Sequence, residues 1–578
     1  MAPTDQLQEV KIMLHGTAAS EGIGIGKVML IEEHSLEYTP RTVTDTEAES
    51  QRFKAAVDAF CYNTEKQAEN LRSSAGEKEA EILAGHIQII KDPYLSGEIE
   101  KLIADGQCAE SALEHMCDMF IAMFSAADDE LTKQRAADVR DIKSGVLGIL
   151  LGVNEIKVSD APKGTVLVAR ELTPSVTAGI VKENIAGIIT ETGGTTSHSA
   201  ILARALEIPA VLSVEGVASS LKNGDTVVVD GSEGAVIVNP DDNTVAEYSK
   251  KRDAFLAERK ELENYRGRET KSASGEVYEL FCNIGKPEDA VKAVDADGEG
   301  VGLFRTEFLF MDRTSIPTED EQFEAYKKAA LILKGKSLII RTLDIGGDKD
   351  IPYLGLEKEE NPFMGFRAIR YCLKNRELFK SQIKAILRAS AFGDIKIMFP
   401  LITTMDELRE GKKLVAECKA DLRNMDINFN ENIQVGVMVE TASAAIIADM
   451  LAKEADFFSI GTNDLTGYTM ACDRGNNDVS YLYSPLQPSV LRMIKRTIEC
   501  GVQNGISVGM CGEAAANKLM IPLLISFGLT EFSVSAPSVL NVRKIISTWT
   551  KEEADKVTAK VLEMSTQQEI VEYLKSVV

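Results

Sequence analysis

One short stretch, Gly193-Gly194-Thr195-Thr196-Ser197-His198-Ser199-Ala200, decides how the first half of the chain folds. Residues 185–190, which precede it, are apolar and rich in β-branched side chains, so they predict a buried strand. Residues 199–207, which follow it, predict a helix that ends before Pro209. The glycines permit a tight turn, and His198 then stands where a strand passes into a helix N-terminus, which favours an anion.

His198 is the best nucleophile candidate in the chain. A lone histidine more often has a structural role, such as capping a helix, and the residue alone leaves that interpretation open. The chain contains five histidines, and only His198 is embedded among glycines and hydroxyl residues. Imidazole is largely neutral at pH 7 and is then a usable nucleophile. We interpret this position as one that holds a phosphate on a ring nitrogen.

The composition excludes several classes of protein. The length of 578 residues allows roughly two to four domains. The net charge of −25 argues against nucleic acid or an anionic membrane as a partner. The nine cysteines have no paired metal-binding spacing, which is typical of a reducing compartment. Since neither a signal-peptide core nor a run of about 18 apolar residues occurs, we expect a cytoplasmic protein without membrane insertion.

Composition and periodicity divide the chain into four parts. Residues 1–35 together with 153–240 carry short apolar strands and turns, which predict one compact α/β domain. Residues 36–152 have helical spacing and predict an inserted bundle of about four helices, a natural docking surface for a protein partner. Residues 241–268 are rich in charged residues and predict a solvent-facing linker helix. Residues 269–578 alternate apolar strands with amphipathic helices.

The last part predicts a (β/α)8 barrel, because eight β/α units over roughly 300 residues fit that fold. A doubly wound open sheet is the structural alternative. The expected strands are residues 277–283, 299–306, 337–344, 395–402, 434–440, 457–462, 507–512 and 532–535. Chemistry gathers at the C-terminal strand ends of such a barrel, so polar residues there are informative.

Basic side chains lie at several of these strand ends. Arg305 and Arg341 lie near the ends of two expected strands, Lys349 follows the second of them, and Arg474 follows the strand at 457–462. Together they form a cluster suited to a multiply charged phosphate, which arginine binds in a bidentate manner. For any single arginine, a structural ion pair is an equally good interpretation.

Metal and proton chemistry is also possible at this end of the barrel. Glu440 ends one expected strand and Asp464 closely follows another, and their hard oxygen atoms can hold Mg²⁺ against the same phosphate. Cys511 lies at the end of another expected strand. A cysteine after a buried strand is usually a core residue, but at a strand end it can donate a proton.

Several long motifs resemble Enzyme I of the bacterial phosphotransferase system, the phosphoenolpyruvate-protein phosphotransferase family. The motifs are the His198 loop with residues 203–211, and residues 304–311, 344–349, 361–370 and 461–466. The resemblance covers nearly the whole chain. It implies a multidomain α/β protein, with a swivelling phosphohistidine α/β domain, an inserted all-helical bundle, a linker helix and a C-terminal (β/α)8 TIM barrel.

The resemblance also implies a reaction. His198 would accept phosphate from phosphoenolpyruvate with Mg²⁺, release pyruvate, and pass the phosphate to a histidine of the phosphocarrier protein HPr. This is the first step of sugar uptake by the phosphotransferase system, and the barrel would form a homodimer. The family pattern implies roles for further residues. It assigns proton donation to Cys511, orientation of the histidine to Thr177, phosphoenolpyruvate binding to Arg305, Arg341, Lys349, Arg367, Asn463 and Arg474, Mg²⁺ binding to Glu440 and Asp464, and HPr docking to the region of His86 and Arg135.

The chain departs from the family pattern at three positions. Thr195 stands where the loop commonly has Arg, Ala442 where Pro is usual, and Ser213 where Gly is usual. None of them replaces the nucleophile, a metal ligand or a barrel arginine, so we expect activity to survive. Two alternatives are a pyruvate-phosphate dikinase-like enzyme, which needs an ATP-binding domain although no GxxxxGK[ST] loop occurs, and an inactive paralogue that serves as a carrier-binding scaffold.

Overall fold

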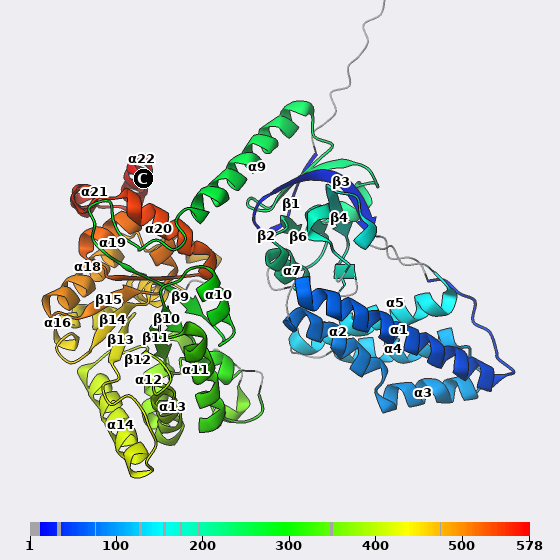
Figure 1. Ribbon diagram of the computed structural model, residues 1–578, viewed down its shortest axis with the longest axis horizontal. Coiled ribbons are helices and arrows are strands. Elements are labelled where there is room, and N and C mark those ends of the chain that lie inside the picture. The colour runs from blue at the N-terminus through cyan, green and yellow to red at the C-terminus, as the bar shows by residue number, and fades with distance from the viewer. Residues whose placement is uncertain are drawn as a thin grey trace, which may run out of the picture. The chain divides into compact units, whose positions relative to one another are not determined.

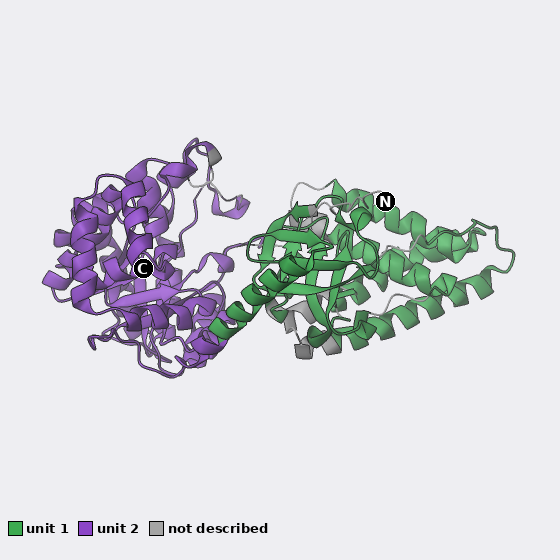
Figure 2. Ribbon diagram, turned by 90° about the horizontal axis from the view of Figure 1, so that it is seen from above, with its two compact units in different colours: residues 1–259 green, residues 260–578 purple. Residues whose placement is uncertain are grey.

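The computed structural model describes most of the chain in two compact units, residues 1–259 and residues 260–578 (Figures 1 and 2). The described residues are 12–31, 36–74, 77–126, 130–153, 158–173, 176–177, 179–194, 197–311, 313–346, 349, 351–473 and 476–578. The boundary between the units falls inside α9 (Asp242–Glu263), a helix rich in lysine and glutamate. Each unit has hydrophobic cores of its own.

Unit 1 contains an eight-stranded sheet in the order β1-β8-β7-β3-β4-β5-β6-β2. Its strands are β1 (Ile12–His15), β2 (Thr17–Ser20), β3 (Ile23–Ile31), β4 (Thr165–Ala169), β5 (Ile185–Thr190), β6 (Ala210–Leu212), β7 (Thr226–Asp230) and β8 (Ala235–Val238). Strands β3 to β6 pair in parallel in chain order, and the remaining pairs are antiparallel. Glycine is required in β3, because a Cβ on Gly24 would stand 2.0 Å from the carbonyl oxygen of Ala186.

Strand β5 ends just before the histidine stretch, as the sequence predicts. Helix α7 (His198–Leu206) follows the stretch, and α8 (Val217–Ser220) comes after β6. The apolar side chains Leu202, Ala203 and Leu206 of α7 are buried in one cluster with Leu212 of β6. This packing fixes the helix against the sheet, so its N-terminus lies at the carboxyl end of β5.

A helical bundle is inserted between β3 and β4. The described residues form five helices here, one more than expected: α1 (Thr46–Ser74), α2 (Glu77–Ile90), α3 (Pro93–Ala104), α4 (Ala109–Ser125) and α5 (Glu130–Leu151). Helix α3 shows why the breaks fall where they do. Asp92 caps it by accepting the N–H groups of Tyr94 at 2.9 Å and Leu95 at 3.2 Å, and Pro93 suits the first helical position.

Unit 2 is a closed barrel of eight parallel strands, so the predicted barrel is confirmed. The strands are β9 (Glu279–Ile284), β10 (Val301–Phe304), β11 (Leu338–Arg341), β12 (Ile395–Phe399), β13 (Val435–Val439), β14 (Phe457–Ile460), β15 (Ser507–Met510) and β16 (Glu531–Val534). Strand β16 pairs with β9 and closes the ring, which rules out an open doubly wound sheet.

Helices surround the barrel. They are α10 (Asp289–Asp295), α11 (Glu319–Leu333), α12 (Ala368–Lys374), α13 (Arg376–Ala389), α14 (Met405–Asn424), α15 (Ala442–Ile446), α16 (Ala448–Leu451), α17 (Thr462–Met470), α18 (Pro488–Gln503), α19 (Ile521–Phe527), α20 (Val539–Thr548), α21 (Lys551–Glu563) and α22 (Gln567–Val577). Helices α11, α14, α21 and α22 begin at capping boxes of a threonine and a glutamate, which satisfy the first N–H groups.

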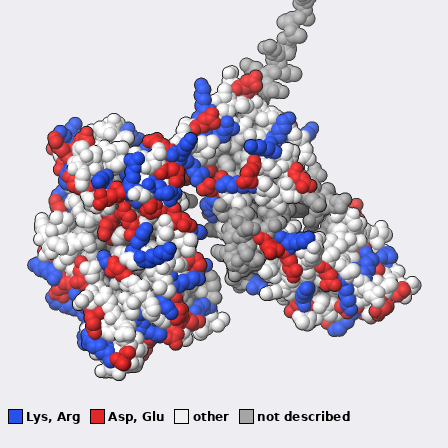
Figure 3. Space-filling view, viewed as in Figure 1, with Lys and Arg blue, Asp and Glu red and all other residues white. Residues whose placement is uncertain are grey.

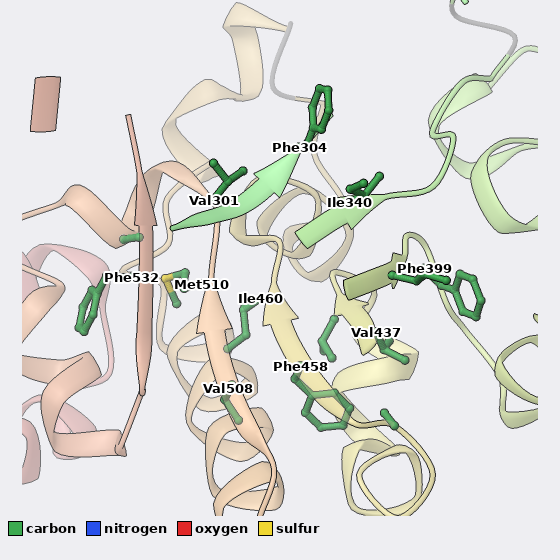
Figure 4. Close-up of a cluster of buried hydrophobic side chains, with 14 of the residues drawn as sticks. Val301, Phe304, Ile340, Phe399, Val437, Phe458, Ile460, Val508, Met510 and Phe532 are labelled. Atoms are coloured by element: carbon green, nitrogen blue, oxygen red, sulfur yellow. The ribbon is translucent and has the colours of Figure 1, made fainter. Parts of the chain in front are cut away.

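Two apolar clusters form the core of the barrel. The large cluster packs the outward side chains of the strands, such as Phe304, Ile340 and Val437, against the helices (Figure 4). A small cluster takes alternate strand residues, among them Ile339 and Met438. Because side chains alternate along a strand, the small cluster fills the barrel interior.

The surface is charged and mixed. On the face shown in Figure 3, acidic and basic side chains are interspersed over both units. Among the described residues, none of the helices is both long and apolar enough to cross a lipid bilayer.

Candidate active site

Charged side chains converge where the barrel strands end. Arg341 is the last residue of β11, and Asp344 follows it by three residues. Glu440 directly follows β13, Asp464 lies in the first turn of α17, and Arg367 directly precedes α12. Because all strands of a parallel barrel end on the same side, these residues meet at one mouth of the barrel.

Three carboxylates form a possible metal site at this mouth. Asp344, Glu440 and Asp464 each offer an oxygen atom, and these atoms all lie within 4.8 Å of one another. Glu440 is 2% exposed, and one of its oxygens accepts the N–H of Leu401 at 2.7 Å. Burial raises the pKa of Glu440 well above its ordinary value, and the charges of Asp464 and Asp344 raise it further. A divalent cation is the partner that such a group of carboxylates favours.

Two arginines pair with carboxylates of this group, Asp344 and Asp464. Arg367 donates to Asp344 Oδ1 from Nε at 3.0 Å and from Nη2 at 2.7 Å, and its Nη2 lies 3.4 Å from Asp464 Oδ2. Arg341 pairs with Asp344 Oδ2 and with Glu307 Oε1, both at 3.0 Å. Although burial alone raises the pKa of Asp344, the two guanidinium groups lower it below its ordinary value. The mouth therefore contains fixed positive and negative charges side by side.

Three of the remaining predicted anion-binding residues, Arg305, Lys349 and Asn463, follow strands at the same mouth. Arg305 directly follows β10 and is exposed, and Lys349 is also exposed. Asn463 lies beside Asp464 on α17, and its Nδ2 donates to Glu513 Oε1 at 3.5 Å. Arg474 lies outside the described residues, so its role remains a prediction.

Cys511 directly follows β15 and belongs to the interior cluster below the mouth. It is 3% exposed, and its thiol faces the carbonyl oxygen of Ile460 at 3.8 Å. Burial raises the pKa of Cys511 to about 11, so the thiol keeps its proton at neutral pH. It is both a core residue and a group that can supply a proton.

The histidine stretch of unit 1 forms the predicted turn into a helix. His198 is the first residue of α7, and Ser197 caps the helix by accepting the N–H of Ala200 at 3.3 Å. Gly193 has a φ of 103°, which requires glycine, and its carbonyl oxygen accepts the hydroxyl of Ser213 at 2.7 Å. The side chain of His198 and residues 195–196 lie outside the part that the structure describes. The nucleophile therefore remains a prediction, placed at a helix N-terminus.

Thr177 belongs to the same unit and is 1% exposed. Its backbone N–H donates to the carbonyl oxygen of Thr173 at 3.0 Å. Its assignment as the hydroxyl that orients the histidine stays a prediction.

The two predicted docking residues lie on neighbouring helices of the bundle but differ in exposure. His86 of α2 is 1% exposed, and its ring nitrogens face Asp138 at 3.3 Å and Asp141 at 3.8 Å, both on α5. Arg135 of α5 is exposed. The ring of His86 thus joins two helices, while Arg135 belongs to the outer surface of the bundle.

Two residues of the barrel mouth are absent from the site that the sequence predicts. Asp344 supplies the third carboxylate, and Glu307 holds Arg341 and also accepts the N–H of Asp344 at 3.2 Å. Their position alone could have indicated them, because both closely follow barrel strands. Their partners depend on contacts between different strands, which the sequence order does not reveal.

Family models and named relatives match most of this chain. Family models match in three places: "PEP-utilising enzyme, N-terminal" at residues 15–135, "PEP-utilising enzyme, mobile domain" at 161–234, and "PEP-utilising enzyme, PEP-binding domain" at 259–550. The phosphoenolpyruvate-protein phosphotransferase of Bacillus subtilis (strain 168) is 46% identical over 570 residues, covering 98% of this chain and 99% of the relative. That of Staphylococcus carnosus (strain TM300) is 43% identical, covering 97% and 98%. A solution structure titled as Enzyme I is 37% identical, with a TM-score of 0.38, and covers 42% of this chain and 99% of its own.

Proposed function

This chain belongs to the phosphoenolpyruvate-protein phosphotransferase family, and from that membership we propose its reaction. The phosphoryl group of phosphoenolpyruvate passes to His198 with release of pyruvate, and then to a histidine of the phosphocarrier protein HPr. This is the first step of sugar uptake by the phosphotransferase system. The observation that carries the proposal is the barrel mouth, where Arg341 and Arg367 lie among three clustered carboxylates.

The cation-lined mouth is proposed to bind phosphoenolpyruvate. Its phosphate and carboxylate groups carry several negative charges, which arginine forks match. Arg341 and Arg367 are held in place by Asp344, so little reorganisation is needed when the ligand arrives. Arg305, Lys349, Asn463 and Arg474 complete the proposed set.

Mg²⁺ is the proposed metal. The residues fit it, because Glu440 and Asp464 are hard oxygen ligands and Asp344 lies within 4.8 Å of both. Bound there, the ion would neutralise charge on the transferred phosphoryl group. Asp344 already pairs with both arginines, so we assign the direct ligands to Glu440 and Asp464.

The chain's own groups carry the protons and the phosphate. His198 is the proposed nucleophile, and the N-terminal N–H groups of α7 favour the phosphate that it acquires. Thr177 is proposed to orient the histidine. The Cys511 thiol is proposed to donate the proton that converts enolpyruvate into pyruvate, which suits a thiol that stays protonated at neutral pH.

The domain division is proposed with the function. Residues 1–35 with 153–240 form the phosphohistidine domain, 36–152 the HPr-binding insertion, 241–268 the linker helix, and 269–578 the substrate-binding and dimerisation domain. Most buried side chains of the bundle form a core of their own, which supports the division, although Ala68 and Leu83 of the bundle belong to the cluster of the α/β sheet. Arg135 contributes to the docking face, and His86 supports that face from inside. The cysteines described in the structure are all unpaired, which fits the proposed cytoplasmic location.

The function is tested by mixing the purified chain with phosphoenolpyruvate, Mg²⁺ and HPr. We expect phosphorylated HPr and pyruvate in equal amounts. Formation of pyruvate without phosphorylated HPr, or a requirement for ATP, would contradict the proposal.

A further inference from the structure

The barrel interior contains a buried acid for which the proposed reaction has no use. Glu531 of β16 is 5% exposed. A Cβ on Gly302 would stand 2.4 Å from Glu531 Oε1, and a Cβ on Gly509 would stand 2.8 Å from it. The carboxyl group thus fills the space that these two glycines leave in the interior. Its Oε1 has no hydrogen-bond partner among the described residues.

Three residues on three neighbouring strands lie side by side at the level of Glu531. The strand register pairs Ser459 of β14 with Gly509 of β15, and Gly509 with Glu531 of β16. Since glycine has no side chain, the Ser459 hydroxyl and the Glu531 carboxyl face each other across two strand spacings, about 10 Å between backbones. Ser459 Oγ is also buried, without a hydrogen-bond partner in the described part of the chain. Two such groups beside a glycine favour an ordered water between them.

Cys511 lies closer to the barrel mouth than these three residues. It comes two residues after Gly509 on the same side of the strand, about 7 Å toward the mouth. Because Ser459 is opposite Gly509 in the register, its hydroxyl lies on the strand next to Cys511, on the same interior face. Ser459 and Glu531 therefore lie on the two strands that flank β15, both at the level of Gly509, two residues below Cys511.

We propose that Glu531, through an ordered water held by Ser459, returns to Cys511 the proton that this thiol loses in each catalytic cycle. The inference rests on the proposed function, in which Cys511 protonates carbon 3 of enolpyruvate. In that step the S–H bond breaks, a C–H bond of the pyruvate methyl group forms, and a thiolate remains. The thiolate takes a proton from the water, the water takes one from the Glu531 carboxyl, and solvent reprotonates the carboxylate.

The surroundings of Glu531 favour a carboxyl group that holds a proton at neutral pH. Burial and the charge of Glu279 together raise the pKa of Glu531 to about 8, against a lowering by Lys396 of β12. The carboxyl is therefore protonated at neutral pH, and transfer to a Cys511 thiolate is downhill, since the pKa of Cys511 is about 11. Glu279 is exposed at the start of β9, directly beside Glu531 in the register, so protons can enter from the N-terminal end of the barrel.

The variant Glu531→Gln tests this role. Glutamine keeps the shape of the protonated carboxyl group but cannot pass on its proton. The first turnover needs only the proton already on Cys511, whereas later turnovers need the proton that Glu531 supplies. With phosphoenolpyruvate, Mg²⁺ and HPr, we expect one pyruvate per chain at the wild-type rate, followed by a steady state about ten-fold slower.

Further variants sharpen the test. Ser459→Ala should give the same burst and slow phase, and Glu531→Asp should partly restore the steady state. The wild-type steady state should fall above about pH 8, and this fall should be missing from Glu531→Gln. Thr558→Val, which removes another buried hydroxyl without a partner in the described chain, is the matched control and should behave as the wild type.

The outcomes distinguish a failure of this inference from a failure of the proposed function on which it rests. Equal steady-state rates in Glu531→Gln and the wild type would overturn the inference. A slow first turnover would also overturn it, because it would indicate damage to the Cys511 site rather than a lost proton supply. If the wild type itself forms neither phosphohistidine nor pyruvate, the proposed function fails and the inference fails with it.

Discussion

Arg367 holds the carboxylate of Asp344 with two nitrogen atoms, Nε at 3.0 Å and Nη2 at 2.7 Å from the same oxygen. Both side chains are nearly buried, 8% and 3% exposed. Removing such charges from water is costly, and the cost is offset only where the geometry is good and further partners are present. Here Arg341 supplies the further partner. The pair therefore holds a guanidinium group at the barrel mouth, in place for an anionic ligand.

The first prediction concerns this pair. Arg367→Lys keeps the charge but loses the planar guanidinium group, which donates two parallel hydrogen bonds. We therefore expect kcat/KM for phosphoenolpyruvate to fall about 100-fold, equivalent to about 2.8 kcal/mol. Steady-state kinetics measures the change. Arg388→Lys is the control, because Arg388 pairs with Glu319 and Asp320 on the outside of the barrel. A similar loss in both variants would contradict a specific role for Arg367.

The second prediction concerns the carboxylates in the absence of metal. The pKa of Glu440 is raised in the folded state, so its contribution destabilises the metal-free protein as pH rises from the unfolded pKa through the folded one. At pH 8, Glu440→Gln should therefore unfold at a higher temperature than the wild type without metal. Mg²⁺ at about 100 times its Kd should stabilise the wild type by about 2.7 kcal/mol and the variant much less.

Calorimetric unfolding of the full chain, with and without Mg²⁺, measures both effects. Asp449→Asn is the control, since Asp449 pairs with Arg496 on the surface at 2.9 Å. An equal response to Mg²⁺ in Glu440→Gln and the control would remove Glu440 from the metal site.

The third prediction separates phosphate transfer from proton transfer. Cys511→Ala should still form phosphohistidine, because the thiol does not touch the phosphate in the proposed reaction. Pyruvate formation should slow by about 10²-fold or more, since a positioned acid is lost. Rapid quenching, with both products measured in one sample, checks this. Unchanged pyruvate formation would refute the proton-donor role.

The fourth prediction contrasts the two bundle residues. Arg135→Ala changes an exposed side chain, so it should weaken HPr binding about ten-fold, or about 1.4 kcal/mol, with no change in unfolding temperature. His86→Ala removes a buried ring that faces Asp138 and Asp141, so it should destabilise the bundle by about 2–4 kcal/mol. Titration with HPr and thermal unfolding distinguish the two. Destabilisation by Arg135→Ala would contradict its place on the surface.

Much of the fold is predictable from local pattern. The strand before the histidine stretch matches β5, and apolar runs predict all eight barrel strands. The ends are less predictable, as β10 shows: its expected range is 299–306, but Arg305 and Thr306 leave the ladder at the mouth. The break between α4 and α5 escapes prediction because residues 126–129 contain neither proline nor glycine.

From the sequence, site residues can be predicted only by their residue type and by their position relative to the strands. Arg341 ends a strand, Glu440 and Asp464 follow strands, and the structure brings them to one mouth. The burial of His86 escapes prediction, because it depends on α2 packing against α5. Glu531 escapes it too, since only closure of the barrel places a charged strand residue inside, between two glycines.

The most direct test of the central claim is to locate the phosphate after the chain reacts with labelled phosphoenolpyruvate and Mg²⁺. The account predicts one phosphate per chain, on His198, and none on His198→Ala, although that variant still binds phosphoenolpyruvate. Stoichiometric labelling of His198→Ala, or phosphate on another residue of the wild type, would contradict it.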